Sequence, residues 1–198
     1  MCINIQTSMF AFIVGIISGL ILLSKSKEKK ALGYFIIFYS FVQFLEANIY
    51  YNNSSIFSRL LLINLGLQGL IFFISFNQVY EIDNYYFIIT GLIATFIIFK
   101  TLNNNFKDAT IGNCVNWNFL DKSTITILAI MYFLMYSWMI IGRKLKKNNS
   151  NIDETFMNKA FVLYLTTLII ARLIPNKALR PGIWCLLSAI TAPVLVLI

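Results

Sequence analysis

The chain has 198 residues, of which 59% are hydrophobic and 12% are charged, and its net charge is +8. Soluble domains have about 45–50% apolar and about 25% charged residues, so this composition excludes an ordinary soluble domain. The lysines and arginines cluster just outside apolar runs, which is typical of membrane topology signals and not of a nucleic-acid partner. The sequence therefore predicts a multi-pass integral membrane protein whose main partner is the lipid bilayer.

Seven apolar runs have about the length of a membrane-spanning helix, which needs about 20 residues with a range of roughly 17–25. Backbone groups in lipid must be paired internally, so each run is predicted to be a helix. The predicted fold class is an all-α bundle of seven transmembrane helices forming a single domain, residues 1–198. The alternative is six spans with one re-entrant or interfacial segment. The predicted spans are 8–23, 31–51, 60–77, 85–100, 123–142, 157–174 and 182–198.

Two basic loops set the predicted orientation. Lysines fill the connection between the first two spans, from Lys25 to Lys30, and basic residues fill the fifth, from Arg143 to Lys147. Cytoplasmic loops carry an excess of Lys and Arg close to the helix ends. The N-terminus is therefore predicted outside and the C-terminus inside.

The second run, 31–51, carries one acid within its apolar length, Glu46, and Gln43 lies one turn before it. A carboxylate at membrane depth is costly, so it usually faces a bundle interior or a cavity. In the third run, Asn64 and Gln68 share one helical face. These two helices are antiparallel and joined by a short loop. We expect Asn64 at the depth of Glu46 and Gln68 at the depth of Gln43.

This polar layer has two interpretations. It is either a pocket or path that opens toward the outside, or a set of interhelical hydrogen bonds worth about 0.6 kcal/mol each. Arg172, near the outside end of the sixth run, is the expected partner of Glu46. Arg59 is the alternative partner, and its own expected role is to reach lipid headgroups. The predicted ion or substrate pathway consists of Gln43, Glu46, Asn64, Gln68 and Arg172.

The longest connection, 101–122, is polar and contains Gly112, so it is predicted to be a loop. Cys114 lies in this loop, while Cys2 and Cys185 lie at the same predicted side of the membrane. Disulfides persist in oxidising compartments, so one bond could tether the loop. Cys114 is its expected member, with Cys185 as the preferred partner and Cys2 as the second choice.

Several chemistries lack the residues that they require. The chain has no histidine, and no phosphate-binding glycine loop or GxSxG motif. Tyr132 and Tyr136, one turn apart in the fifth run, are interpreted as core. We expect no catalytic residues, no metal site and no cofactor, and therefore no enzyme.

Short motifs along the chain resemble a known family. They are Met1-Cys2 with Ser8, Gly15 and Gly19, then Gln43 to Glu46, the Cys114 loop, and Gly182 to Cys185. Together they resemble an uncharacterised family of multi-pass membrane proteins encoded by large DNA viruses and some algae. The resemblance implies an origin and a host or viral membrane as the location. It implies no catalytic residues, because that family has no assigned activity.

Two functions fit the sequence. The first is a small transporter or channel in which Glu46 contacts an ion, a proton or a small solute, and it predicts water in the polar layer. The second is a non-catalytic receptor-like or viral envelope protein whose polar layer only locks the helices together, and it predicts a dry interior. The first is slightly favoured.

Overall fold

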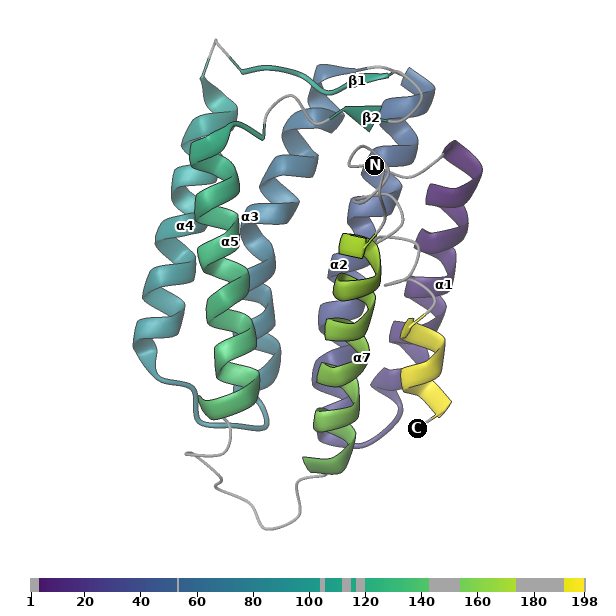
Figure 1. The fold of residues 1–198 in the computed structure, drawn as a ribbon, viewed down its shortest axis with the longest axis vertical. Helices are drawn as coiled ribbons and strands as arrows, with labels where there is room; N and C mark the ends of the chain where they lie inside the picture. Colours follow the sequence, from purple (N-terminus) through teal and green to yellow (C-terminus); the bar gives the residue numbers. More distant parts are fainter. Residues whose placement is uncertain are drawn as a thin grey trace.

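The computed structural model describes residues 4–52, 54–103, 106–111, 115–116, 120–142, 154–173 and 191–197. They form a helical bundle with one very short strand pair (Figure 1). Residues 191–197 are also helical. The elements in chain order are α1 Ile5–Leu23, α2 Lys27–Asn52, α3 Ser55–Asn77, α4 Asn84–Leu102, β1 Thr110–Ile111, β2 Val115–Asn116, α5 Lys122–Ser137, the π-helical turn η1 Trp138–Gly142, and α7 Glu154–Leu173.

Two helices form the interior of the bundle. In α2 and α3, 67% and 61% of the most apolar 18-residue window is buried, against 33% in α1, α4 and α5. The outer helices expose large apolar side chains along one stripe, such as Ile13, Ile17 and Leu20 of α1. Because α2 and α3 are covered on most sides, polar side chains in the middle of these two helices lie inside protein, and they include Gln43, Glu46, Asn64 and Gln68.

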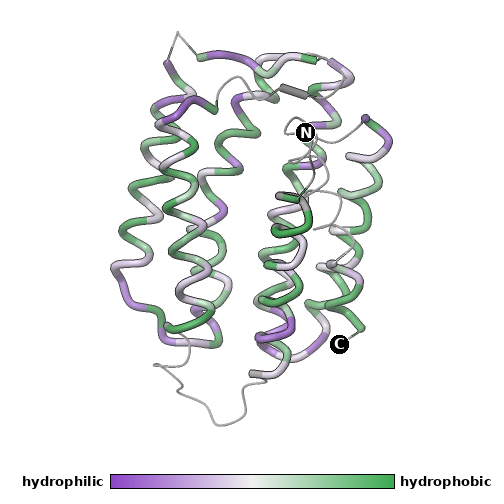
Figure 2. Tube along the Cα trace, viewed as in Figure 1, coloured by the Kyte–Doolittle hydropathy of each residue, from purple (hydrophilic) through white to green (hydrophobic). Residues whose placement is uncertain are grey.

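The hydrophilic residues gather at the two ends of the bundle, and the helices between them are mainly hydrophobic (Figure 2). At one end lie the start of α2, with Lys27 to Lys30, and η1. We call this the lysine end. At the other lie the end of α2, the start of α3 and the strand pair, and we call this the hairpin end. This distribution is the one that a bilayer requires of a spanning bundle.

The first five predicted spans are present as helices. Each is long and apolar enough to cross a membrane, and these candidate spans are Ile5–Leu23, Lys27–Asn52, Ser55–Asn77, Asn84–Leu102 and Lys122–Ile141. Several begin or end a few residues beyond the predicted bounds, because a helix continues through the charged residues that end an apolar run.

The last two predicted spans are described only in part. Span 157–174 corresponds to α7, which is helical but is not among the five candidates. Of span 182–198, only residues 191–197 lie within the described residues. The number seven and the orientation therefore stay predictions.

The long connection after α4 is predicted from the sequence to be a loop, but it contains a short strand pair. β1 and β2 form an antiparallel pair in which Thr110 opposes Asn116 and Ile111 opposes Val115. Three of these four residues are β-branched, which favours strands. The amide of Ala109, just before β1, donates to Ser58 Oγ of α3 at 3.1 Å. This contact holds the hairpin against the bundle.

Small residues join α1 and α2. The buried stripe of α1 contains Ser8, Ala11, Gly15 and Gly19. A Cβ added at Gly33 of α2 would lie 2.8 Å from the Gly19 carbonyl oxygen. Small residues at a helix crossing let two backbones approach closely, which is a common way to join helices in membranes.

At the lysine end, Trp138 lies inside a group of aromatic rings from α3 and the turn after it. Its ring centroid lies 5.7 Å from those of Phe72 and Phe76, 5.9 Å from that of Phe73 and 5.3 Å from that of Tyr80. Aromatic pairs at 4.5–7 Å contribute about 0.5–1.5 kcal/mol each beyond their buried area. This cluster fixes the α5–η1 junction against α3.

Replacing Gly33 by alanine tests the α1–α2 crossing. The new methyl group would meet backbone atoms of Gly19 that cannot rotate away, so we expect a loss of about 1–3 kcal/mol of stability. The measurement is reversible denaturation in detergent micelles. The control is Gly91→Ala in α4, where an added Cβ has no atom within 4 Å and alanine should be neutral or stabilising. Equal effects of both substitutions would contradict the close crossing.

Candidate functional site

The two polar residues of α2 that the sequence predicts to face the interior are buried in the bundle. Glu46 is 0% exposed and Gln43 is 2% exposed. Both lie on the helical face that also carries Tyr39, which is buried. A carboxyl group at this depth is expected to serve an ion or substrate pathway or to pair with a fixed charge.

A chain of hydrogen bonds connects three helices beside these residues. Tyr132 of α5 donates its hydroxyl to Gln68 Oε1 of α3. The amide nitrogen of Gln68 donates to Asn64 Oδ1 at 3.3 Å, and the amide nitrogen of Asn64 donates to the Phe38 carbonyl of α2 at 3.4 Å. Polar groups in the interior of a membrane bundle must find partners in the protein, and here each one joins two elements or two turns.

The predicted depths of the two polar faces need a correction. Asn64 lies beside Phe38, which precedes Glu46 by eight residues, or about 12 Å at 1.5 Å per residue. Asn64 is therefore nearer to the middle of α2 than to Glu46. Counting residues from the short α2–α3 connection places Asn64 opposite Glu46 only if both helices are upright, and the hydrogen bond to Phe38 shows a different register.

Of the two arginines predicted as partners of Glu46, the structure describes the side chain of Arg59 but not that of Arg172. The side chain of Arg172 is outside the described residues, so its pairing with Glu46 stays a prediction. Arg59 donates to the Thr101 carbonyl near the end of α4 and lies 4.9 Å from the ring of Phe106. It joins α3 to α4 at the hairpin end. Its predicted roles, to reach lipid headgroups or to pair with Glu46, stay predictions.

The predicted disulfide cannot be placed. Cys2, Cys114 and Cys185 all lie outside the described residues. The disulfide therefore stays a prediction. Among the described residues, no group of three or more His, Cys, Asp or Glu could hold a metal ion.

A cavity lies between α2, α3, α5, η1 and α7, in the half of the bundle toward the lysine end. The volume of the cavity, measured as the space open to the centre of a water-sized sphere, is about 40 Å³. One water molecule needs about 10–15 Å³ of volume measured in this way. The described residues that line the cavity do not include Gln43, Glu46, Asn64 or Gln68 of the predicted pathway. Aromatic side chains dominate its wall, and they are Phe35, Tyr39, Phe72, Tyr132, Tyr136 and Tyr164.

This cavity departs from the predicted one in place and in character. The sequence predicts a polar pocket that opens toward the outside through the layer of Glu46. The observed cavity is aromatic and lies on the other side of that layer, and Tyr132 connects the two because its ring lines the cavity while its hydroxyl bonds Gln68. Tyr132 and Tyr136, interpreted from sequence as core, are cavity-lining residues. Their one-turn spacing was the only available sequence signal.

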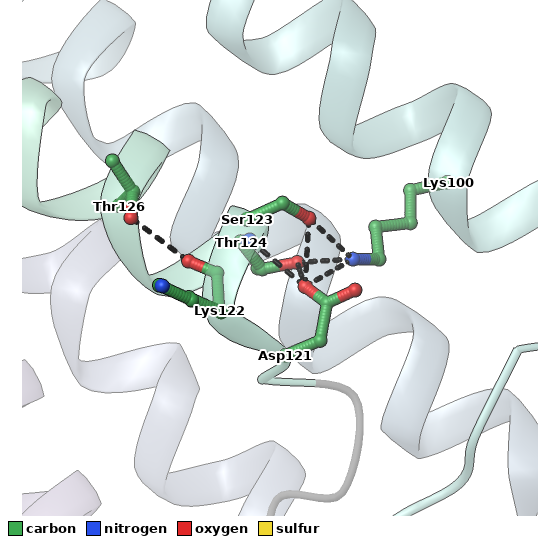
Figure 3. Close-up of polar contacts among 6 residues, drawn as sticks. All are labelled: Lys100, Asp121, Lys122, Ser123, Thr124 and Thr126. Carbon is green, nitrogen blue, oxygen red and sulfur yellow. Dashed lines mark hydrogen bonds and ion pairs between the residues drawn. The ribbon is translucent and has the colours of Figure 1, made fainter.

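A charged cluster at the hairpin end connects α4 to α5 (Figure 3). Asp121 caps α5 by accepting from the Thr124 amide at 2.9 Å and from the Ser123 hydroxyl at 2.9 Å. Lys100 forms an ion pair with the same carboxylate. The hydrogen bond from Lys100, followed by those from Thr124, holds the pKa of Asp121 far below its ordinary value of 3.8. These contacts join the first turn of α5 to the end of α4, which is a structural role.

Comparisons with protein-family models, with curated proteins and with solved structures found no match to this chain. The resemblance to a family of large DNA viruses and algae therefore stays a prediction from short motifs. The class that the structure defines is a helical bundle, and within the described ranges five of its helices are long and apolar enough to cross a membrane.

A double-mutant cycle tests the hydrogen bond between α5 and α3. Tyr132→Phe leaves Gln68 Oε1 without its donor, and Gln68→Leu removes the acceptor. We expect each to cost about 1–3 kcal/mol, with a coupling of about 0.6 kcal/mol or more, because unsatisfied buried amides are costly. Denaturation in detergent measures both, and the control is Tyr51→Phe near the end of α2, where the side chain is 79% exposed. Strict additivity would contradict the bond.

The Asp121 cap predicts a dependence of stability on pH. A carboxyl whose pKa is lowered in the folded state stabilises it above the unfolded pKa, and this contribution is lost as the pH falls below about 4. Asp121→Asn retains a good helix cap but removes the charge. The side chain is 56% exposed, so the difference at pH 7 should be at most about 1 kcal/mol. The melting temperatures of the two proteins should begin to converge as the pH falls below about 4 and should continue to converge toward about pH 2. A constant difference between them would contradict the ion pair.

Proposed function

We propose that the chain is a multi-pass integral membrane protein that acts as a small transporter or channel. The five apolar helices support the membrane location, because they are long enough to cross a bilayer and carry their hydrophilic residues at the ends. The proposal includes seven spans with the N-terminus outside, from the basic loops that follow the first and fifth spans.

One observation supports transport. Glu46 is fully buried in the most enclosed helix, and it shares a helical face with Gln43 and with cavity-lining Tyr39. A fixed structural role would be served more cheaply by an amide, since a buried carboxylate costs several kcal/mol of solvation. A titratable group inside a spanning bundle and in line with a cavity is the arrangement that a proton or cation pathway needs.

A second function is favoured by a different observation. Asn64 and Gln68 bond each other, Tyr132 and a backbone carbonyl, which is what interhelical locking requires. In that case the protein is a non-catalytic receptor-like or envelope component and the amides only hold α2, α3 and α5 in register. The two functions differ in what Glu46 does, and not in the role of the amides.

Flux through reconstituted vesicles distinguishes the two. Purified protein in liposomes loaded with a pH-sensitive dye, with a potassium gradient across the membrane, should give cation or proton flux above that of empty vesicles. Glu46→Gln keeps the shape of the side chain and removes its charge, so flux should fall to the empty-vesicle level while the protein stays folded.

The matched control is Glu81→Gln, which changes an exposed acid in the α3–α4 connection and should leave flux unchanged. Circular dichroism and gel filtration confirm folding of all three proteins. Absence of flux in the wild type, or full flux in folded Glu46→Gln, would favour the structural role instead.

A further inference from the structure

One face of α2 carries a carboxyl group on each side of the aromatic cavity. At about 100° per residue, Glu28 and Glu46 fall on the same face as Phe35 and Tyr39, which line the cavity. Glu28 begins this face at the lysine end and precedes Phe35 by two turns, while Glu46 follows Tyr39 by two turns. The cavity therefore lies between two buried acids along one helix.

Glu28 was not singled out by its sequence, because it stands among lysines. In the structure it is only 5% exposed, whereas its neighbours Lys27 and Lys30 are exposed. No hydrogen bond or ion pair joins it to any of the described residues. A buried carboxylate is costly unless positive charge is near. The N-terminus of α2 supplies partial positive charge, since Glu28 lies in its first turn, and the lining of the cavity begins one turn further on at Leu32.

The wall of the cavity is suited to a cation. Six aromatic side chains from α2, α3, α5 and α7 surround it, together with the polarisable sulfurs of Met135 and Met139, and no basic side chain is among its described lining residues. The faces of aromatic rings are negative, and they attract ammonium groups most strongly where water is excluded. At this end Lys29 already holds its ammonium 4.8 Å from the ring centroid of Phe156, one turn before cavity-lining Ala160.

We propose that this cavity binds a small organic ammonium ion, with Glu28 supplying a negative charge at the lysine end. A methylated ammonium group fits better than a metal ion, because aromatic rings provide cation–π contacts but few oxygen ligands. The proposal deepens the proposed function by naming a substrate class, and it rests on that function only in treating the ligand as transported. Binding alone does not depend on transport.

The probe is choline, and its matched control is 3,3-dimethylbutan-1-ol, which has the same shape without the charge. Binding to the full chain in nanodiscs is measured by isothermal titration. We expect choline to bind and the neutral alcohol to bind at least about tenfold more weakly. Equal binding of the two compounds would show a merely apolar cavity and overturn the proposal, as would the absence of choline binding.

Variants separate the ring from its hydroxyl. Tyr136→Phe keeps the aromatic face and should keep the affinity, whereas Tyr136→Leu should lower it about twofold to thirtyfold. Glu28→Gln should lower choline affinity and leave the alcohol unaffected. Tyr85→Leu, on an exposed side of α4, is the control and should change nothing. Unchanged choline affinity in folded Tyr136→Leu and Glu28→Gln would place binding elsewhere and overturn the proposal.

The binding and flux experiments distinguish failure of the proposed ammonium site from failure of the proposed transport function. Choline binding in nanodiscs without flux in vesicles would leave the cavity site intact and remove the transporter. Glu46-dependent flux without choline binding would leave the transporter intact and remove this ligand class.

Discussion

The structure depends on one constraint, which is that polar groups inside an apolar bundle must be satisfied by the protein itself. A chain of hydrogen bonds satisfies the buried amides of α3. It runs from Tyr132 through Gln68 and Asn64 to the Phe38 carbonyl, and it fixes α5 and α2 against α3. Because these partners come from separate helices, a shift of any one helix would leave a buried amide unsatisfied. These hydrogen bonds thus set the register of the helices, and the apolar side chains pack around them.

Packing around this register is done with very small and very large side chains. Glycines at the α1–α2 crossing bring the backbones together, whereas the rings around Trp138 fill the space between α3 and η1. Small residues favour close approach and rings favour wide separation. The cavity lies where α2, α3, α5 and α7 meet. Its wall includes Phe72, which packs against Trp138, and Phe35, which packs against Phe72.

The same face of α2 then acquires a functional meaning. In the proposed function, the acids Glu28 and Glu46 and the aromatic rings between them attract a positive charge along α2, from the lysine end to beyond the middle of the helix. The opposite end is organised differently, since Asp121 and Arg59 are committed to capping α5 and to joining α3 to α4. Charges at the hairpin end therefore stabilise the fold, while those on α2 remain candidates for function.

The amino-acid sequence alone determined that the chain is helical and where its first five long helices lie, because hydropathy and length decide whether a segment can span a bilayer. It also determined that Gln43, Glu46, Asn64 and Gln68 are buried, since polar residues on inner helices turn away from lipid. Tertiary structure alone decided the register of α3 against α2, the place of the cavity, the burial of Glu28 and the contacts of Arg59. These depend on helix tilt and on neighbours distant in the chain, and no local pattern encodes either of them.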